Sequence, residues 1–218
     1  MELESLFTGS KWDIMKELRK SPKTPLELSR ILESSSPNIS QQLRLLELAE
    51  LIKKERSKGT EKGRPETKYS LTRKFSYIIS INNLTEKKIL DMGEHHSAIL
   101  NIWFLQNTEL HYYLEKFFWL HEDIFKSSEF IGFLGSKENE IELLIINKNP
   151  DELITVFDNL TIIREEKSKK LKALFFTPDE AGRFSVQDEH FISLINRVHP
   201  IHDPNDLLNK LKMNNPGI

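Results

Sequence analysis

Residues 36–52 read SPNISQQLRLLELAELI and carry the clearest periodic pattern of the chain. Three apolar side chains recur at intervals of four and three residues, which places them on one face of a helix: Ile39, Leu43 and Leu46. At ~100° per residue, Gln41 and Arg44 point nearly opposite that face. Pro37 suits the first helical turn, where no N–H is needed. The pattern predicts an amphipathic helix with a polar outward face.

The outward face carries amide, hydroxyl and guanidinium groups, which are the groups that contact DNA. Amides pair with adenine edges, and arginine pairs with guanine or with phosphate. The helix start near Ser36 also offers backbone N–H groups to a phosphate. An ordinary solvated helix surface has a similar composition, so that interpretation stays open for this segment alone. The expected DNA contacts are Ser36, Asn38, Ser40, Gln41, Gln42 and Arg44.

Two shorter amphipathic helices are expected before this one. The first begins near Ser10 and carries four apolar side chains at helical spacing: Trp12, Ile14, Met15 and Leu18. The run 21–25 ends it and starts the second, because Thr24 is a suitable N-cap and Pro25 fits the first turn. The second helix carries Leu26, Leu28, Ile31 and Leu32. A serine triplet, 34–36, separates it from the third helix.

A basic hairpin is expected after the third helix. Residues 51–56 and 67–71 have strand character, and residues 57–66 between them hold two glycines and one proline. Four cations on this hairpin are expected to reach phosphates: Lys58, Lys62, Arg64 and Lys68. A guanidinium such as that of Arg64 also suits a narrow minor groove. A lysine-rich solvated surface is the alternative.

Both motifs resemble those of the ArsR group of winged-helix repressors. The family pattern S-x-x-x-S-x-H-L-x-x-L-x-x-A-G-L-I is similar to residues 36–52, and G-R-P-x-x-x-Y-x-L-T is similar to residues 63–72, which read GRPETKYSLT. Gln42 stands where histidine is usual, and Glu50 where glycine is usual. The resemblance covers about residues 10–74. It implies a winged helix-turn-helix over 1–82 and a homodimeric, sequence-specific transcriptional regulator that binds double-stranded DNA.

Charge and composition agree with that expectation. Residues 1–76 hold 16 Lys/Arg and 11 Asp/Glu, a surplus of five positive charges, whereas residues 77–218 hold 15 and 22. A local positive field suits a polyanion. The absence of cysteine excludes disulfides, cysteine nucleophiles and thiolate metal sensing. With no apolar run of membrane-spanning length and no leader-like N-terminus, a cytoplasmic protein without a membrane partner or cofactor is expected.

Residues 83–127 are expected to form a helical linker or dimerisation region. The helical pattern runs from a cap at Thr85 to about Lys126, with a break at Asn107-Thr108. Eight of the 20 aromatic residues lie between positions 103 and 125, more than one buried stripe needs. A dimerisation surface is favoured because most small regulators are two-fold dimers. A domain core and a pocket for a small-molecule effector are the alternatives.

Residues 128–218 are expected to form an α/β domain with a small mixed sheet, which makes the whole chain α+β. Strands are expected at 130–134, 141–146, 161–164 and 171–176, and helices at 151–160, 184–198 and 204–213. Gly135-Ser136 and Glu140-x-Glu142 resemble a degenerate small nucleotidyltransferase fold, whose paired carboxylates hold two Mg²⁺ ions. Only three residues separate the two motifs, and a plain β-hairpin explains residues 130–147 equally well.

This C-terminal domain is therefore expected to regulate or assemble the protein, with no catalytic and no metal-binding residues. Glu replaces Asp at both carboxylate positions, and the seven histidines lack the spacing of a known metal motif. The alternatives are a DNA-tethered nucleotidyltransferase-like enzyme and a winged-helix protein-interaction module.

Overall fold

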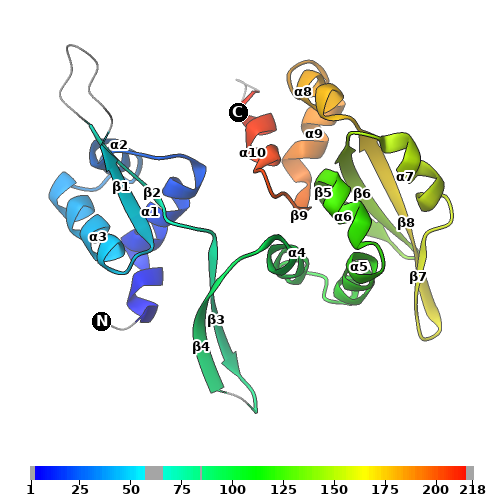
Figure 1. The fold of residues 1–218 in the computed structure, drawn as a ribbon, viewed down its shortest axis with the longest axis horizontal. Helices are drawn as coiled ribbons and strands as arrows, with labels where there is room; N and C mark the ends of the chain where they lie inside the picture. The colour runs from blue at the N-terminus through cyan, green and yellow to red at the C-terminus, as the bar shows by residue number, and fades with distance from the viewer. Residues whose placement is uncertain (1–2, 57–65, 84, 215–218) are drawn as a thin grey trace. The chain divides into compact units, whose positions relative to one another are not determined.

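The computed structural model describes residues 3–56, 66–83 and 85–214. It divides into two compact units, Met1–Asp91 (unit 1) and Met92–Ile218 (unit 2), each built from helices and strands (Figure 1). The mixed helix and strand class expected from the sequence is confirmed. Among the described residues, no helix is long and apolar enough to cross a membrane.

Unit 1 begins with four helical segments: η1 (Leu3–Phe7), α1 (Gly9–Lys20), α2 (Pro25–Ile31) and α3 (Ser36–Leu48). The Thr24 side chain accepts a hydrogen bond from the Glu27 N–H while the Glu27 carboxylate accepts one from the Thr24 N–H, so the expected cap of α2 is confirmed. The first helix has Thr8 rather than Ser10 at its N-cap position, and the Thr8 side chain makes no capping hydrogen bond. These helices enclose one core, which includes Leu6, Ile14, Met15, Leu18, Leu28, Ile39, Leu43 and Leu46.

An antiparallel hairpin of β1 (Ile52–Arg56) and β2 (Thr67–Leu71) follows α3, as expected. Ile52 lies opposite Leu71, and both pack against the helical core. Glu50 takes the left-handed conformation, with φ of 58°, in the turn that leads into β1. Because Glu50 has a Cβ, this conformation costs about 1 kcal/mol more than it would for glycine.

The prediction that a helix begins at Thr85 is wrong. Thr85–Asp91 is a strand, β4, which pairs antiparallel with β3 (Phe75–Ile81). The hairpin is anchored on the N-terminal segment, because the Tyr77 ring stacks on Phe7 at 4.7 Å and the Lys87 ammonium lies 2.6 Å from the Glu4 carboxylate. The boundary between the units therefore follows Asp91, not residue 82.

Three helices open unit 2: α4 (Glu94–Trp103), α5 (Glu109–Leu120) and α6 (Glu122–Ser127). The break expected at Asn107-Thr108 is confirmed. Residues 92–127 belong to unit 2 instead of forming a separate region. Half of the aromatic cluster is buried in its core (Tyr113, Phe117, Phe118 and Phe125), and half remains exposed (Trp103, Phe104, Tyr112 and Trp119).

A five-stranded mixed sheet forms the centre of unit 2, in the order β7-β8-β6-β5-β9. Its strands are β5 (Ser128–Lys137), β6 (Glu140–Asn147), β7 (Thr161–Arg164), β8 (Lys167–Phe176) and β9 (His199–His202). Strands β5 and β6 form an antiparallel hairpin, while β6 and β8 are parallel and connected through α7 (Pro150–Phe157) and the edge strand β7. The expected small mixed sheet is confirmed, and β9 is an additional strand.

The helices cover both faces of this sheet (Figure 1). Core side chains of α4–α7 pack with Ile141, Leu143 and Ile145 of β6. The alternate residues Leu144 and Ile146 pack with α8 (Pro178–Gln187), α9 (Glu189–Arg197) and α10 (Leu207–Met213). The single helix expected over 184–198 is wrong, because Asp188 ends α8 and its carboxylate accepts a 2.7 Å hydrogen bond from the Phe191 N–H that begins α9.

Candidate nucleic-acid interface

Helix α3 has a buried face and a solvent face, as its sequence pattern predicts. Ile39, Leu43 and Leu46 have no exposed surface, whereas the side chains of Ser36, Ser40, Gln41 and Arg44 lie in solvent. The Ser35 hydroxyl accepts a hydrogen bond from the Asn38 N–H and caps the first turn. Burial of the apolar stripe therefore fixes which side chains α3 presents outward.

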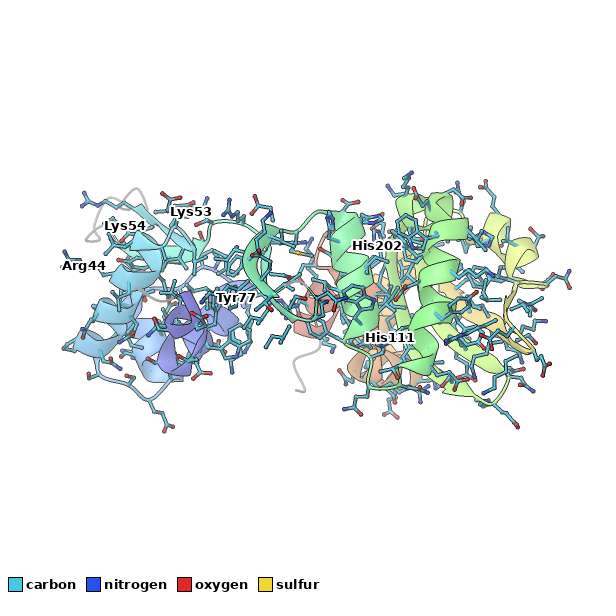
Figure 2. The ribbon with its side chains drawn as sticks, turned by 90° about the horizontal axis from the view of Figure 1, so that it is seen from below. Arg44, Lys53, Lys54, Tyr77, His111 and His202 are labelled. Atoms are coloured by element: carbon cyan, nitrogen blue, oxygen red, sulfur yellow. The ribbon has the colours of Figure 1, made fainter. Side chains whose placement is uncertain are left out.

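Gln41 and Arg44 are exposed polar side chains on the outward face of α3. Within the described residues, neither side chain makes a hydrogen bond or ion pair with another part of the protein. Figure 2 shows Arg44 projecting away from the helices of unit 1. Both groups keep their hydrogen-bonding capacity for a partner outside the chain.

Asn38 and Gln42 differ from Gln41, because the structure places them in an internal network. The Gln42 Nε2 donates to Asn38 Oδ1 at 3.2 Å, and the Asn38 Nδ2 donates to the Ser34 hydroxyl at 2.9 Å. The Lys11 ammonium donates to Gln42 Oε1 at 3.4 Å. Gln42, at the position where the resembling family has histidine, thus links α3 to α1, and its amide is partly occupied.

Strand β1 contributes three exposed cations that the sequence analysis did not single out: Lys53, Lys54 and Arg56. The Lys54 ammonium lies 3.4 Å from the Glu47 carboxylate of α3, so this strand runs beside the outward helix. The Lys53 ammonium lies 2.7 Å from the Glu55 carboxylate on the same strand. The uninterrupted run of charged residues at 53–56, which follows the buried Ile52, was the available signal for them.

Lys68 is exposed on β2, directly opposite Glu55 of β1. The pKa of Glu27 on α2 is lowered mainly by hydrogen bonds from the Thr24 N–H and hydroxyl. The positive charge of Lys68 lowers the same pKa further, so this charge is felt at α2. The other predicted hairpin contacts, Lys58, Lys62 and Arg64, lie outside the described residues.

In unit 2, Gly135 and Ser136 lie inside strand β5, opposite Glu142 and Ile141. The hairpin turns at Glu138-Asn139, between the ends of β5 and β6. The two carboxylates of the Glu140-x-Glu142 pair both have lysine partners, because the Lys172 ammonium lies 2.5 Å from Glu140 and the Lys137 ammonium lies 3.0 Å from Glu142. The hydrogen bond from Lys172 lowers the pKa of Glu140.

The histidines of unit 2 make packing contacts. The His111 Nε2 lies 3.0 Å from the Leu105 carbonyl, and the His199 Nε2 lies 2.7 Å from the Asn101 carbonyl. His202 is buried with its ring 5.8 Å from that of Phe125. Over the described ranges, no three His, Asp or Glu side chains gather closely enough to hold a metal ion.

Three helices, the third of them polar and exposed, followed by a basic antiparallel hairpin, define a winged helix-turn-helix. Residues 9–54, from α1 to the first residues of β1, match the model of a family described as bacterial regulatory protein, arsR family. A comparison with curated proteins gives no match. The N-terminal unit therefore carries an ArsR-family helix-turn-helix, which supports a DNA-binding transcriptional regulator rather than an enzyme.

Proposed function

We propose that this protein is a sequence-specific transcriptional regulator that binds double-stranded DNA as a homodimer, with α3 in the major groove. The observation that carries the proposal is the pair of exposed, unengaged side chains of Gln41 and Arg44 opposite the fully buried stripe of Ile39 and Leu43. A recognition helix needs this division, because its inner face must hold it rigidly while its outer face reads base edges.

The contacts divide by chemistry. The Gln41 amide suits an adenine edge, and the Arg44 guanidinium suits guanine or a backbone phosphate. Lys68 on β2 and Lys54 on β1 are exposed cations suited to phosphates, which position the helix without reading sequence. Ser36 and Ser40 offer hydroxyl groups in the first turns of α3. In this proposal α3 supplies the specificity for sequence, and the hairpin of β1 and β2 adds affinity for the phosphate backbone.

The test is a selection of bound sequences from a random duplex library, followed by titration of the selected duplex at ~50 mM salt, where phosphate contacts are strong. The wild-type protein should select a defined site, and the Gln41→Ala/Arg44→Ala double variant should lose that preference. The matched control is Gln187→Ala/Arg197→Ala, which removes the same two exposed side-chain types from unit 2. Failure of the wild-type protein to bind any duplex would overturn the proposal.

Two copies are proposed because one short recognition helix reads only a few base pairs, and a two-fold dimer doubles the site with half-sites about 34 Å apart. Three large side chains exposed in unit 2 suit burial against a second copy: Trp103, Phe104 and Trp119. Phe104, 72% exposed, packs little within its own unit. Light scattering should therefore report a dimer for the wild-type protein and a monomer with intact helix content for Phe104→Ser. A wild-type monomer at micromolar concentration would contradict this part.

A further inference from the structure

Unit 2 contains a polar cavity of about 810 Å³ that the DNA-binding proposal does not use. Its wall comes from three places: the start of α5 and the residues just before it, the turn of the β5–β6 hairpin, and the β7–β8 hairpin. Two of the residues that line it, Tyr113 and Lys169, are buried. Its volume is that of a site for a small metabolite.

Lys169 places a positive charge inside this wall. The residue is only 7% exposed, and its ammonium donates one hydrogen bond of 2.7 Å to the Glu138 carbonyl. The ammonium also lies 5.7 Å from the centre of the Tyr113 ring. Among the described residues, Lys169 has no carboxylate partner, although a buried ammonium is costly unless an anion pairs with it.

Tyr113, a second buried residue of the cavity wall, carries a polar group without a partner among the described residues. The residue is fully buried in the core between α5 and the sheet, and in the described part of the chain its hydroxyl has no hydrogen-bond partner. A buried hydroxyl without a partner is destabilising, so such groups normally meet a ligand, water or a second polar group. An oxyanion accepts hydrogen bonds from both an ammonium and a hydroxyl.

Four glutamates line the cavity (Glu109, Glu138, Glu140 and Glu166), and among the described residues none of their carboxylates forms an ion pair with Lys169. Two of the four are held by other lysines. The Glu140 carboxylate lies 2.5 Å from the Lys172 ammonium, and the Glu109 carboxylate lies 3.7 Å from the Lys167 ammonium. Both of these ion pairs are at the exposed rim. Lys169 is buried in the wall and has no ion pair among the described residues, so its charge is available to a bound anion.

We propose that this cavity binds a small organic anion whose phosphate or carboxylate group is held by the Lys169 ammonium and the Tyr113 hydroxyl. The amide of Asn107 and the hydroxyls of Ser136 and Ser168 line the cavity and provide hydrogen bonds for the rest of the ligand. The site lies wholly within unit 2, so it is a candidate entry point for a chemical signal in a protein whose DNA-binding helix is in unit 1.

Three small probes with a three-carbon skeleton distinguish a phosphate site from a carboxylate site and from a site without charge preference: glycerol 3-phosphate, glycerate and neutral glycerol. Each is titrated into the full-length protein by calorimetry, in a buffer without phosphate or carboxylate. At least one anion should bind with millimolar or better affinity, and glycerol should not. The stronger anion identifies the headgroup as phosphate or carboxylate.

Two buried variants and one rim variant then locate the site. Lys169→Met keeps the length of the side chain and Tyr113→Phe keeps the ring, and each should weaken anion binding by about tenfold or more, since hydrogen bonds to a charged group are strong. Lys167→Met removes the same charge from the exposed rim and should change affinity less than about threefold, as expected of a screened surface charge.

Thermal unfolding of the unliganded variants shows that each is folded before it is titrated. Binding of neither anion by the wild-type protein, or equal losses in Lys167→Met and Lys169→Met, would overturn the proposal. The readout involves no DNA, so its failure is distinct from failure of the proposed DNA-binding function.

Discussion

Gln42 donates a hydrogen bond of 3.2 Å from its Nε2 to the Asn38 Oδ1 one turn earlier on α3, while its Oε1 accepts one from Lys11 of α1. The neighbouring Gln41 has the same side chain but lies in solvent. Two adjacent glutamines on one helix therefore have different environments: Gln42 is hydrogen-bonded within the domain, whereas the Gln41 amide is exposed to solvent.

Gln41→Ala and Gln42→Ala should consequently have different effects on DNA binding. Gln41→Ala should remove preference at one base pair, worth about 1–3 kcal/mol. Gln42→Ala should lower the affinity for every DNA sequence by a common factor and lower the thermal stability of the protein, because it removes internal hydrogen bonds of about 1 kcal/mol each. Titration against a panel of single-base-pair variants of the selected site measures both effects. Identical profiles for the two variants would refute this division.

Lys68→Ala should reduce affinity for every duplex without altering the preferred sequence, because we expect its ammonium to contact phosphate. The slope of the logarithm of the binding constant against the logarithm of salt concentration should fall by about 1. Lys148→Ala, an exposed lysine of unit 2, is the control and should leave the slope unchanged. An unchanged slope for Lys68→Ala would remove Lys68 from the interface.

Arg64 should contribute more to DNA affinity than Lys62, a prediction that rests on their side-chain chemistry. A guanidinium is less strongly hydrated than an ammonium and enters a narrow minor groove more readily. Arg64→Ala should therefore reduce affinity most where A·T pairs flank the site. Competition between A·T-flanked and G·C-flanked duplexes measures this, and equal losses for Arg64→Ala and Lys62→Ala on both duplexes would leave phosphate contact alone.

Gly132→Ala should destabilise unit 2, whereas Gly135→Ala on the same strand should not. A Cβ at Gly132 would collide with Val198 and would lie 2.7 Å from a ring carbon of Phe130, but a Cβ at Gly135 would meet nothing within 4 Å. Overpacking of this kind costs about 1–3 kcal/mol. Hydrogen exchange of the β5 and β6 amides measures the loss within unit 2, and comparable protection in both variants would contradict the collision.

The Glu140→Gln/Glu142→Gln double variant tests the nucleotidyltransferase-like alternative. Because lysines hold both carboxylates, we expect DNA binding and Mg²⁺ affinity to remain nearly unchanged. Calorimetric titration with MgCl₂ and an assay for Mg²⁺-dependent nucleotidyl transfer provide the measurements. Turnover by the wild-type protein that disappears in the double variant would identify an enzyme.

The sequence alone determined the winged helix-turn-helix, because its signals are short-range. The spacing of Ile39, Leu43 and Leu46 fixes one buried face within a single helix, and the Thr24 cap acts across three residues. The outward position of Gln41 and Arg44 follows from the same spacing. The exposure of the β1 cations likewise follows from a short-range signal, the run of charged residues 53–56.

Only the tertiary structure determined the role of residues 85–91, whose local pattern also fits a helix. Strand β4 forms because β3 supplies its hydrogen-bonding partner and the Phe7–Tyr77 stack anchors the pair, and these contacts join residues far apart in the chain.

The internal network of Gln42 and the cavity of Tyr113 and Lys169 were equally hidden from the sequence. Lys11 meets Gln42 across 31 positions, and Tyr113 and Lys169 come together only when α5 packs against the β7–β8 hairpin. A periodic pattern shows which face of an element is buried, whereas the contacts of a polar group depend on which elements pack against it.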